Sequence, residues 1–471
     1  MKRRDFLRVS GATVAGLGAS GVASEQVAAG RPRRSSGERP NILMITCHDI
    51  GQHIGCYRVE TVHTPNIDAL AARGIRFANY FATDCVCSPS RGCILTGRYP
   101  QANGLMGLTH EPWNWRFHEG ERHLAAILKD AGYATTLVGL QHVTQGDPHA
   151  LGYEKVLSEK RVAEETVEAA GRELAQARKG GKPFFMKVGF FEVHRPFKNG
   201  KDTEKGVAIP HYLQDTPEIR EDLAMFQGTI RYFDNCVGRI LKALEASAVA
   251  GETLVVFTSD HGIPYPGAKW ALFDPGMETP LVLYRPGTAM EGGKVLEQLM
   301  SNVDFMPTLL DLVGVDTPAN LHGYSFKRVI EGKQKQSPRR EVYAQRTSHA
   351  LYDNLSRCVR TERYKLIRYF EPGRSVIYPT EAVPQRVAEH VERPRRRGGR
   401  RPVVELYDLQ ADPHERHNLA QLAEHAQTVR HLSDKLWTWM EQVGDPLLKG
   451  PLPTPYYQEA MQDYHRRFQR R

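Results

Sequence analysis

The chain of 471 residues is 41% hydrophobic, 25% charged and 9% aromatic, a composition that excludes a disordered chain, a coiled coil and a collagen-like repeat. Its formal net charge of +9 is only mildly basic and does not indicate a nucleic-acid partner. No apolar run reaches the roughly 18–20 residues that a membrane span requires, so we expect a soluble body of two or three domains.

Residues 1–29 have the pattern of an export signal. The paired Arg3 and Arg4 precede a stretch rich in Gly and Ala that continues to Ala23. This order is typical of a twin-arginine signal peptide cleaved at Ala23 or a few residues later, although a basic, frayed terminus would share its first residues. We therefore expect an exported protein, periplasmic or extracellular in a bacterium, with residues 30–39 as a flexible linker.

Short apolar runs alternate with amphipathic segments between residues 40 and 335, which predicts an α/β domain. The near-continuous Val, Ile, Leu and Phe character of each run indicates strands covered on both faces, as in a mainly parallel sheet sandwiched by helices. We expect these strands at 41–47, 134–138, 183–191, 253–258 and 280–284. Helices are expected from Thr64 and Pro65 to the residue before Gly74, at 123–131 and at 217–247.

Polar side chains follow four of these strands at the point where each strand ends. In chain order they are His48 and Asp49, then His142, then His194, and finally Asp260 and His261. The carboxyl ends of parallel strands share one edge of an open α/β sheet, and ligands bind at that edge. We therefore expect these side chains to form one shared site, although a single histidine after a strand is more often a surface or capping residue.

Residues 336–471 have a different pattern, which predicts a smaller α+β subdomain with an antiparallel sheet. Its strands are expected at 341–346, 356–361, 364–369 and 403–409, followed by a helix at 419–443. A run of arginines between two of these strands is either a solvated loop or a docking patch for polyanions; it comprises Arg393, Arg395, Arg396, Arg397, Arg400 and Arg401.

Seven cysteines are an odd number for an exported chain, so at least one is unpaired or has another use. No two have C-x-x-C spacing, which argues against a zinc ribbon. Within CVCSPSRGCILTGRYP, Pro89 suits the first turn of a helix that Gly97 terminates. Cys87 then lies at the amino end of this helix, where free N–H groups favour anions, and Arg91 adds a fixed cation one turn further on. The simpler alternative is a buried structural cysteine.

This segment, from Cys87 through Arg91 to Gly97 and Arg98, resembles the signature of the type I sulfatases. In that family the matching cysteine is oxidised after synthesis to an aldehyde, formylglycine, which is the catalytic residue. The resemblance implies an alkaline-phosphatase-like fold, a catalytic domain over 40–335, and a formylglycine-generating or equivalent maturation enzyme as a partner. It also accounts for the odd cysteine.

The resemblance extends along most of the chain. Matching segments are 40–43 followed by Asp49, 64–70, 258–262, 405–408, Asp412 with Pro413, and Asn418 with Leu419. Within the family, the passages 103–108, 262–266 and 280–281 most resemble heparan N-sulfatase (sulfamidase) and its bacterial relatives.

By matching position, the resemblance implies that Asp49, Asp260 and His261 bind one divalent cation together with an oxygen of the modified Cys87. Family members use calcium, a hard ion that suits oxygen ligands. The cation would lower the pKa of the aldehyde hydrate and neutralise charge on the sulfuryl group.

The resemblance also implies the proton transfers. His194 is placed like the general acid that protonates the leaving group, and His142 like the base that removes the second hydroxyl proton of the hydrate and releases sulfate. An imidazole suits both tasks because its unperturbed pKa is about 6.5. Lys269 matches a cation that steadies the sulfate.

Two positions depart from the family pattern. His48 stands where a second Asp is common, which admits manganese or zinc in place of calcium if His48 is a ligand. Leu140 stands where a sulfate-binding Lys is common, so one cation is missing unless Lys269, Arg195 or Arg91 substitutes for it.

Hydrolysis of sulfate esters or sulfamates of a sulfated carbohydrate is therefore the leading hypothesis, and the basic surplus of the chain suits an anionic substrate. A phosphodiesterase or phosphonate hydrolase of the same fold is the alternative among enzymes. A catalytically inactive protein that binds sulfated glycans is the third hypothesis, motivated by His48 and Leu140. The sequence leaves open the choice between O–S and N–S bonds, the sugar, the metal, the cysteine pairing and the oligomeric state.

Overall fold

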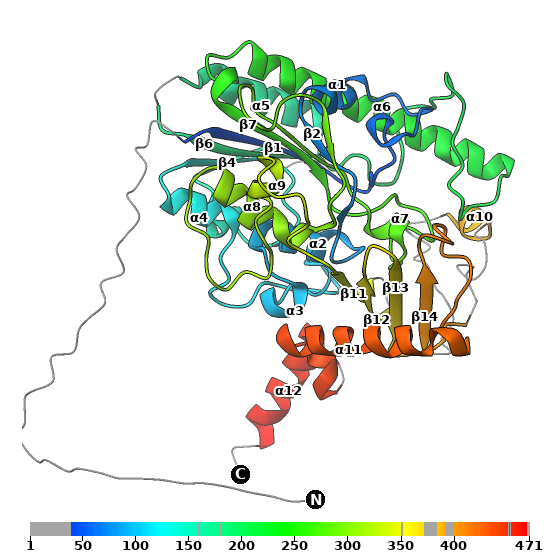
Figure 1. Ribbon diagram of the computed structural model, residues 1–471. Helices are drawn as coiled ribbons and strands as arrows, with labels where there is room; N and C mark the ends of the chain where they lie inside the picture. The colour runs from blue at the N-terminus through cyan, green and yellow to red at the C-terminus, as the bar shows by residue number, and fades with distance from the viewer. Residues whose placement is uncertain are drawn as a thin grey trace, which may run out of the picture. The chain divides into compact units, whose positions relative to one another are not determined.

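This computed structural model describes residues 39–158, 161–178, 181–349, 352–371, 384–390, 400–450, 452 and 454–468. Within the described residues, eight strands form the central sheet (Figure 1). Their order across the sheet is β5 (Lys155–Leu157), β4 (Ala134–Gly139), β6 (Phe184–Gly189), β1 (Asn41–Cys47), β7 (Thr253–Ser259), β8 (Leu281–Tyr284), β2 (Ile75–Phe77) and β9 (Lys294–Leu296). Neighbours run parallel except β8, which is antiparallel to both β7 and β2. The predicted mixed, mainly parallel sheet is confirmed.

Helices cover both faces of this sheet (Figure 1). One face carries α1 (Pro65–Arg73), α5 (Ala163–Gln176) and α6 (Pro217–Glu245), and the other carries α4 (Leu124–Asp130), α8 (Phe305–Leu312) and α9 (Lys327–Ile330). Successive side chains of a strand point to opposite faces. Accordingly Leu43 and Ile45 of β1 pack into the core on the first face, whereas Ile42 and Met44 pack into the core on the second.

Local signals in the sequence determine where these helices begin. Pro65 and Pro217 occupy the first turns of α1 and α6, where a missing N–H group has no cost. The Thr216 hydroxyl accepts from the Ile219 amide at 3.4 Å, and the His123 imidazole accepts from the Ala125 amide at 3.0 Å at the start of α4. The three helices predicted before residue 250 are therefore confirmed, with ends that differ by one or two residues.

A second, antiparallel sheet follows later in the chain, in the order β11 (Val342–His349), β12 (Tyr352–Arg360), β13 (Tyr364–Tyr369) and β14 (Val404–Asp408). Helix α11 (Ala426–Gln442) covers it, because Leu432, Leu436 and Trp439 pack against Leu366 and neighbouring strand residues. The predicted antiparallel sheet is confirmed. The predicted start of the helix at 419 is wrong, since α11 begins at Ala426 and Leu419 instead donates its amide to the Leu406 carbonyl of β14.

The remaining described elements are two short strands, five helices and six 3₁₀ turns. The strands are β3 (Tyr80–Phe81) and β10 (Met300–Ser301), which pair in parallel. The helices are α2 (Cys87–Thr96), α3 (Pro100–Asn103), α7 (Asp274–Met277), α10 (Gln385–Ala388) and α12 (Pro455–Phe468). The 3₁₀ turns are η2 (Gly55–Tyr57), η3 (Pro148–Leu151), η4 (Ala250–Glu252), η5 (Asn302–Asp304), η6 (Ala423–His425) and η7 (Pro446–Lys449). None of the described helices is both long and apolar enough to span a membrane.

Several sequence-based predictions lie outside the described residues: the signal peptide over 1–29, all but the last residue of the linker, and Arg393, Arg395, Arg396 and Arg397 of the arginine run. Arg400 is exposed, and the Arg401 guanidinium lies 5.7 Å from the ring centroid of Tyr369. The division between a catalytic domain and a C-terminal subdomain at residue 335 stays a prediction.

A buried ion network joins α7 to the antiparallel sheet. Asp274 is 3.0 Å from Arg360 Nη2 and 2.5 Å from Lys365 Nζ, and Lys365 Nζ is 2.7 Å from Glu415 Oε1. Burial opposes ionisation of Asp274, but Arg360 and Lys365 outweigh it and hold the pKa of this carboxyl well below its usual range. Since α7 follows the loop that carries Lys269, the network fixes that loop against the second sheet.

We predict that Asp274→Asn destabilises the protein by about 3–5 kcal/mol, because it leaves two buried cations without their shared counter-charge. Urea denaturation followed by circular dichroism measures the change. Glu245→Gln is the matched control, because Glu245 pairs with Arg73 at an exposed site where a salt bridge contributes less than about 1 kcal/mol. Equal stability changes in the two variants would contradict the structural role of the network.

Candidate active site

The strand ends bring the predicted polar side chains together. In the register of the sheet, Cys47 of β1 is paired with Ser259 of β7, and Thr46 of β1 is paired with Gly189 of β6. The segments that follow β1, β6 and β7 therefore leave the sheet side by side, and β4, paired with β6, adds the segment that contains His142. The expectation of one shared edge is confirmed.

Helix α2 presents Cys87 to this edge. Cys87 is the first residue of α2, which ends at Gly97 in the left-handed conformation with φ of 65°. The Cys87 Sγ atom lies 3.3 Å from His261 Nε2 and 3.9 Å from Asp49 Oδ1. Burial raises the pKa of the Cys87 thiol, so the unmodified side chain is a neutral thiol rather than a thiolate. The predicted position at the amino end of a helix is confirmed.

Asp260 is held by charged and backbone donors. Its Oδ1 atom accepts from the amides of Asp49 and His261, each at 3.0 Å, and its Oδ2 atom accepts from Arg91 Nε at 3.1 Å. Arg91 also donates from Nη2 to the Cys47 carbonyl at 2.7 Å, so the guanidinium bridges α2, β1 and β7. Burial opposes ionisation of Asp260, but His261 and Arg91 outweigh it and hold its pKa well below the usual range.

Asp49 is the second buried carboxylate of the site. Its Oδ2 atom is 2.7 Å from Lys269 Nζ and 3.8 Å from His194 Nε2, and its Oδ1 atom is 3.3 Å from His261 Nε2. Burial by itself would raise the pKa of Asp49, but Lys269 together with His194 and His261 outweighs burial, and the net effect lowers that pKa. Conversely, Asp49 raises the pKa of Lys269 against the effect of burial, so both groups are ionised at neutral pH.

The backbone around the site adopts uncommon conformations. Asp49, His142 and Trp270 have φ values of 52°, 61° and 68°, in the left-handed region that residues other than glycine seldom adopt. Such conformations concentrate at functional sites, where the surrounding contacts enforce them.

Two histidines have their ring orientation set by carbonyl groups. Nδ1 of His261 is 2.9 Å from the Gly262 carbonyl, and Nδ1 of His194 is 2.7 Å from the Arg195 carbonyl. A carbonyl oxygen can only accept, so Nδ1 carries the proton in both rings and Nε2 offers a lone pair to the site. Burial, followed by repulsion from Lys269, lowers the pKa of His194 to about 4, so its ring is neutral at pH 7 without a bound anion.

His48 lies at the centre of the group without a hydrogen bond among the described residues. It is fully buried, and neither of its ring nitrogens has hydrogen-bond geometry to a described partner, although Nδ1 lies 3.0 Å from Asp260 Oδ2. Burial and Arg91 lower the pKa of His48 to about 3, which keeps the imidazole neutral. With its proton on Nδ1, toward Asp260, a neutral His48 has a buried lone pair on Nε2 that a metal ion could accept.

One ligand atom from each of His48, Asp49, Cys87 and Asp260 lies within 4.8 Å of the others. Two ionised carboxylates and a neutral imidazole fit a divalent cation, since the carboxylate oxygens have further lone pairs and His48 Nε2 has no hydrogen-bond partner among the described residues. His261 Nε2 is close enough to join this set, at 3.3 Å from Cys87 Sγ.

His142 faces His48 across the site. The two ring centroids are 5.2 Å apart, and His142 stacks on His110 with centroids 5.8 Å apart and an interplanar angle of 6°. Nδ1 of His142 is buried without a hydrogen-bond partner among the described residues. Burial, followed by repulsion from His48, lowers the pKa of His142 well below its ordinary value.

Arg195 is engaged away from the carboxylates. Its guanidinium pairs with Asp222 of α6, donates from Nε to the Pro264 carbonyl at 3.2 Å, and lies 4.3 Å and 4.8 Å from the ring centroids of Phe197 and Tyr265. The substrate-binding role of Arg195 stays a prediction, and in this structure its charge is balanced by Asp222.

Sequence reasoning missed Lys187 of β6, which lies beneath the site. Its Nζ atom is buried and donates to the Leu140 carbonyl at 3.0 Å, and burial together with Arg91 lowers its pKa well below the ordinary value. A lysine in the middle of the apolar run at 183–191 was the signal that could have revealed it, because buried strands seldom contain an ionisable residue without a reason. His110 was also missed, and its only signal was a loop position.

Comparisons with known proteins agree with the geometry. Residues 40–315 match the family model described as Sulfatase, and residues 267–397 match the model of the C-terminal region of N-sulphoglucosamine sulphohydrolase. N-sulphoglucosamine sulphohydrolase of Homo sapiens is 27% identical, covering 87% of this chain and 92% of that protein. An ulvan-active sulfatase of Formosa agariphila is 28% identical, covering 89% of this chain and 83% of that protein.

Solved structures share the fold. One, determined in complex with its substrate D-glucosamine-2-N,6-O-disulfate, has a TM-score of 0.68 and 22% identity, covering 86% of this chain and 98% of that chain. The phosphonate monoester hydrolase of Agrobacterium radiobacter has a TM-score of 0.66 and 21% identity, covering 86% and 96% respectively.

We predict that Arg91→Lys destabilises the protein by about 1.5–3 kcal/mol, because an ammonium group cannot reach both Asp260 and the Cys47 carbonyl and one hydrogen bond of a charged group is lost. Urea denaturation measures the difference. Arg363→Lys is the control, because Arg363 pairs with Asp408 at an exposed position. A loss for Arg91→Lys no larger than that of the control would show that the bridging contacts are dispensable.

Proposed function

This chain belongs to the sulfatase family of sulfuric ester hydrolases and resembles its sulfamidase-like members, and from this premise we propose that it removes sulfate from a sulfated carbohydrate, as an O-ester or an N-sulfamate. The observation that carries the proposal is the position of Cys87, whose Sγ atom at the amino end of α2 lies 3.9 Å from Asp49 Oδ1 and 3.3 Å from His261 Nε2. The named activities of the relatives support a saccharide substrate.

We propose that Cys87 is converted to formylglycine by a maturation enzyme and that the matured site binds one divalent cation. The hydrated aldehyde would supply the oxygen nucleophile, and the cation would act as a Lewis acid toward the sulfuryl oxygens. Asp49, Asp260 and His261 would hold the cation, with His48 as an additional ligand. Two carboxylates favour calcium, while a ligating His48 favours manganese or zinc.

The chain's own residues provide the rest of the chemistry. Lys269 stays charged beside Asp49, at 2.7 Å, and can donate to a sulfuryl oxygen that approaches position 87. Arg91 keeps the Asp260 carboxylate in place through a hydrogen bond of 3.1 Å, and acts by positioning that carboxylate rather than by touching substrate. Lys269 and Arg91 together neutralise the two carboxylates, so that an anion can bind beside Asp49 and Asp260.

His194 is proposed as the proton donor to the leaving oxygen or nitrogen. Its Nδ1 proton is fixed on the Arg195 carbonyl at 2.7 Å, so Nε2 alone exchanges protons with a ligand. The pKa of about 4 in the anion-free site rises when an anionic sulfate group arrives, since an opposite charge favours the protonated ring. His142, with a buried and unpaired Nδ1 among the described residues, is proposed as the proton acceptor.

Export by a twin-arginine signal to a bacterial periplasm or to the outside stays a proposal that rests on the sequence alone. It fits the rest of the proposal because this route exports folded proteins, so that a modification made in the cytoplasm would accompany the chain.

We predict that protein whose Cys87 peptide carries the aldehyde by mass spectrometry releases sulfate from N-sulfoglucosamine or O-sulfated glucosamine, measured by ion chromatography. Cys87→Ala should reduce the rate by more than about 10⁴-fold, because it removes the nucleophile. Cys85→Ala, two residues away, is the matched control and should retain activity. Faster turnover of an aryl phosphodiester would favour a phosphodiesterase or phosphonate hydrolase, and glycan binding without turnover would favour an inactive binding protein.

We predict that His194→Ala lowers kcat for a sulfated sugar by about 10²–10⁴-fold but has a much smaller effect on a nitrophenyl sulfate, whose leaving group needs no protonation. Steady-state kinetics on the two substrates measures the ratio. His53→Gln, at a buried histidine outside the group of strand-end residues, serves as the control and should affect both substrates alike. An equal loss for both substrates in His194→Ala would argue against general-acid catalysis.

A further inference from the structure

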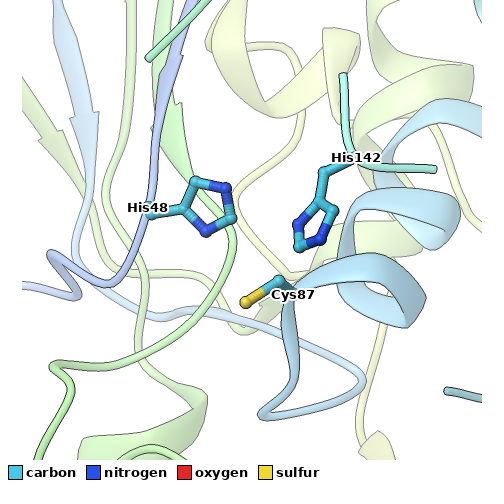
Figure 2. Close-up of side chains that lie close together, drawn as sticks. All are labelled: His48, Cys87 and His142. Carbon is cyan, nitrogen blue, oxygen red and sulfur yellow. The ribbon is translucent and has the colours of Figure 1, made fainter. Parts of the chain in front are cut away.

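Three side chains from separate parts of the chain converge on one point of the site (Figure 2). His48 follows β1, Cys87 begins α2, and His142 lies on the loop after β4. One ligand atom of each, two imidazole nitrogens and one sulfur, lies within 4.8 Å of the others. Figure 2 shows the two rings facing each other above the Cys87 side chain.

Two ring nitrogens of this group have no hydrogen-bond partner among the described residues. They are Nε2 of His48 and Nδ1 of His142, both buried, whereas Nδ1 of His48 lies 3.0 Å from Asp260 Oδ2. His48 is fully buried, and its ring centroid is 5.2 Å from that of His142 at an interplanar angle of 53°. Leaving buried polar atoms unsatisfied costs free energy, so a ligand that accepts their lone pairs would stabilise this arrangement.

The donor atoms of this group determine which metal ion it would bind. A thiolate and two imidazoles are the donor set of zinc, whereas calcium prefers oxygen ligands. The set shares His48 and position 87 with the carboxylate set but differs from it, because it contains His142 and needs the sulfur of Cys87, which an aldehyde at that position does not have. This sulfur-containing ligand set therefore exists only while Cys87 has not been converted to formylglycine.

We propose that the unconverted chain binds one zinc ion through Cys87 Sγ and one ring nitrogen each of His48 and His142. A carboxylate oxygen of Asp49 or Asp260 or a water molecule completes four-coordination, because both carboxylates have an oxygen within 4.8 Å of His48 and Cys87. Binding forms a zinc–sulfur bond and releases the thiol proton to the solvent, with no change in oxidation state.

This zinc site goes beyond the proposed function and does not depend on it. It concerns the protein with an intact Cys87, which has no nucleophile for sulfate hydrolysis under that proposal. Failure of the zinc site would leave sulfate release by the converted enzyme untouched, and failure of sulfate release would leave the zinc site untouched.

The test uses the full chain produced without a maturation enzyme, with an intact Cys87 verified by mass spectrometry. Zinc is titrated against a chromophoric chelator, and cobalt(II) is titrated separately as a spectroscopic probe. We expect one zinc per chain and, with cobalt, an intense near-ultraviolet absorption from thiolate-to-metal charge transfer. Metal binding without this absorption would place the ion on the carboxylates and would overturn the proposal, as would no binding at all.

Variants identify the ligands. Cys87→Ala should abolish the charge-transfer absorption, and His48→Gln and His142→Gln should each weaken zinc binding by more than about 100-fold, which exceeds the cost of losing an outer-shell partner. Cys85→Ala and His53→Gln are the matched controls, since each removes a buried side chain of the same type outside the group.

His142 is only half-buried and lies on a loop, so its variant remains informative if the Cys87 or His48 variant fails to fold by circular dichroism. An unchanged zinc affinity in a folded His142→Gln protein, or an equal loss in the two controls, would overturn the proposal.

Discussion

The site depends on keeping two carboxylates ionised in the interior of the protein. Asp49 and Asp260 are both fully buried, and burying a charge without a partner would cost several kcal/mol for each. The protein offsets this cost with two buried cations, Arg91 on Asp260 and Lys269 on Asp49, and with amide donors to Asp260. These four charges balance, and they determine how α2, the loop after β7 and the segment after β1 meet.

With histidine rather than a third carboxylate at position 48, the site carries one negative charge fewer. With His48 neutral, the two acids and the two cations sum to zero, so a bound divalent cation would make the site positive and attractive to a sulfate ester. The same substitution places a nitrogen ligand beside Cys87 and opposite His142. One residue thereby gives the site two overlapping donor sets, one rich in oxygen and one containing sulfur and nitrogen.

The supports of the site are distributed over both sheets. Asp274 joins Arg360 and Lys365 of the antiparallel sheet to the segment just after Lys269, and this contact extends over a separation of 86 residues from Asp274 to Arg360. Asn302, far from Ser90 in the chain, donates to the Ser90 hydroxyl at 3.0 Å, and that hydroxyl donates to the Asp260 carbonyl. Both contacts depend on how distant segments pack, so neither was predictable from local pattern.

The sequence by itself determined the apolar strands, their mainly parallel class, the helix that begins at Cys87, and the polar residues at the strand ends, because these follow from residue periodicity, turn residues and the shared edge of a parallel sheet. It did not determine that Lys187 would lie beneath the site, that Arg195 would pair with Asp222, or that residues 419–425 would stay outside the helix. Only the tertiary structure decided these points and the low pKa of His194, since burial and the choice of charged partners depend on segments far apart in the chain.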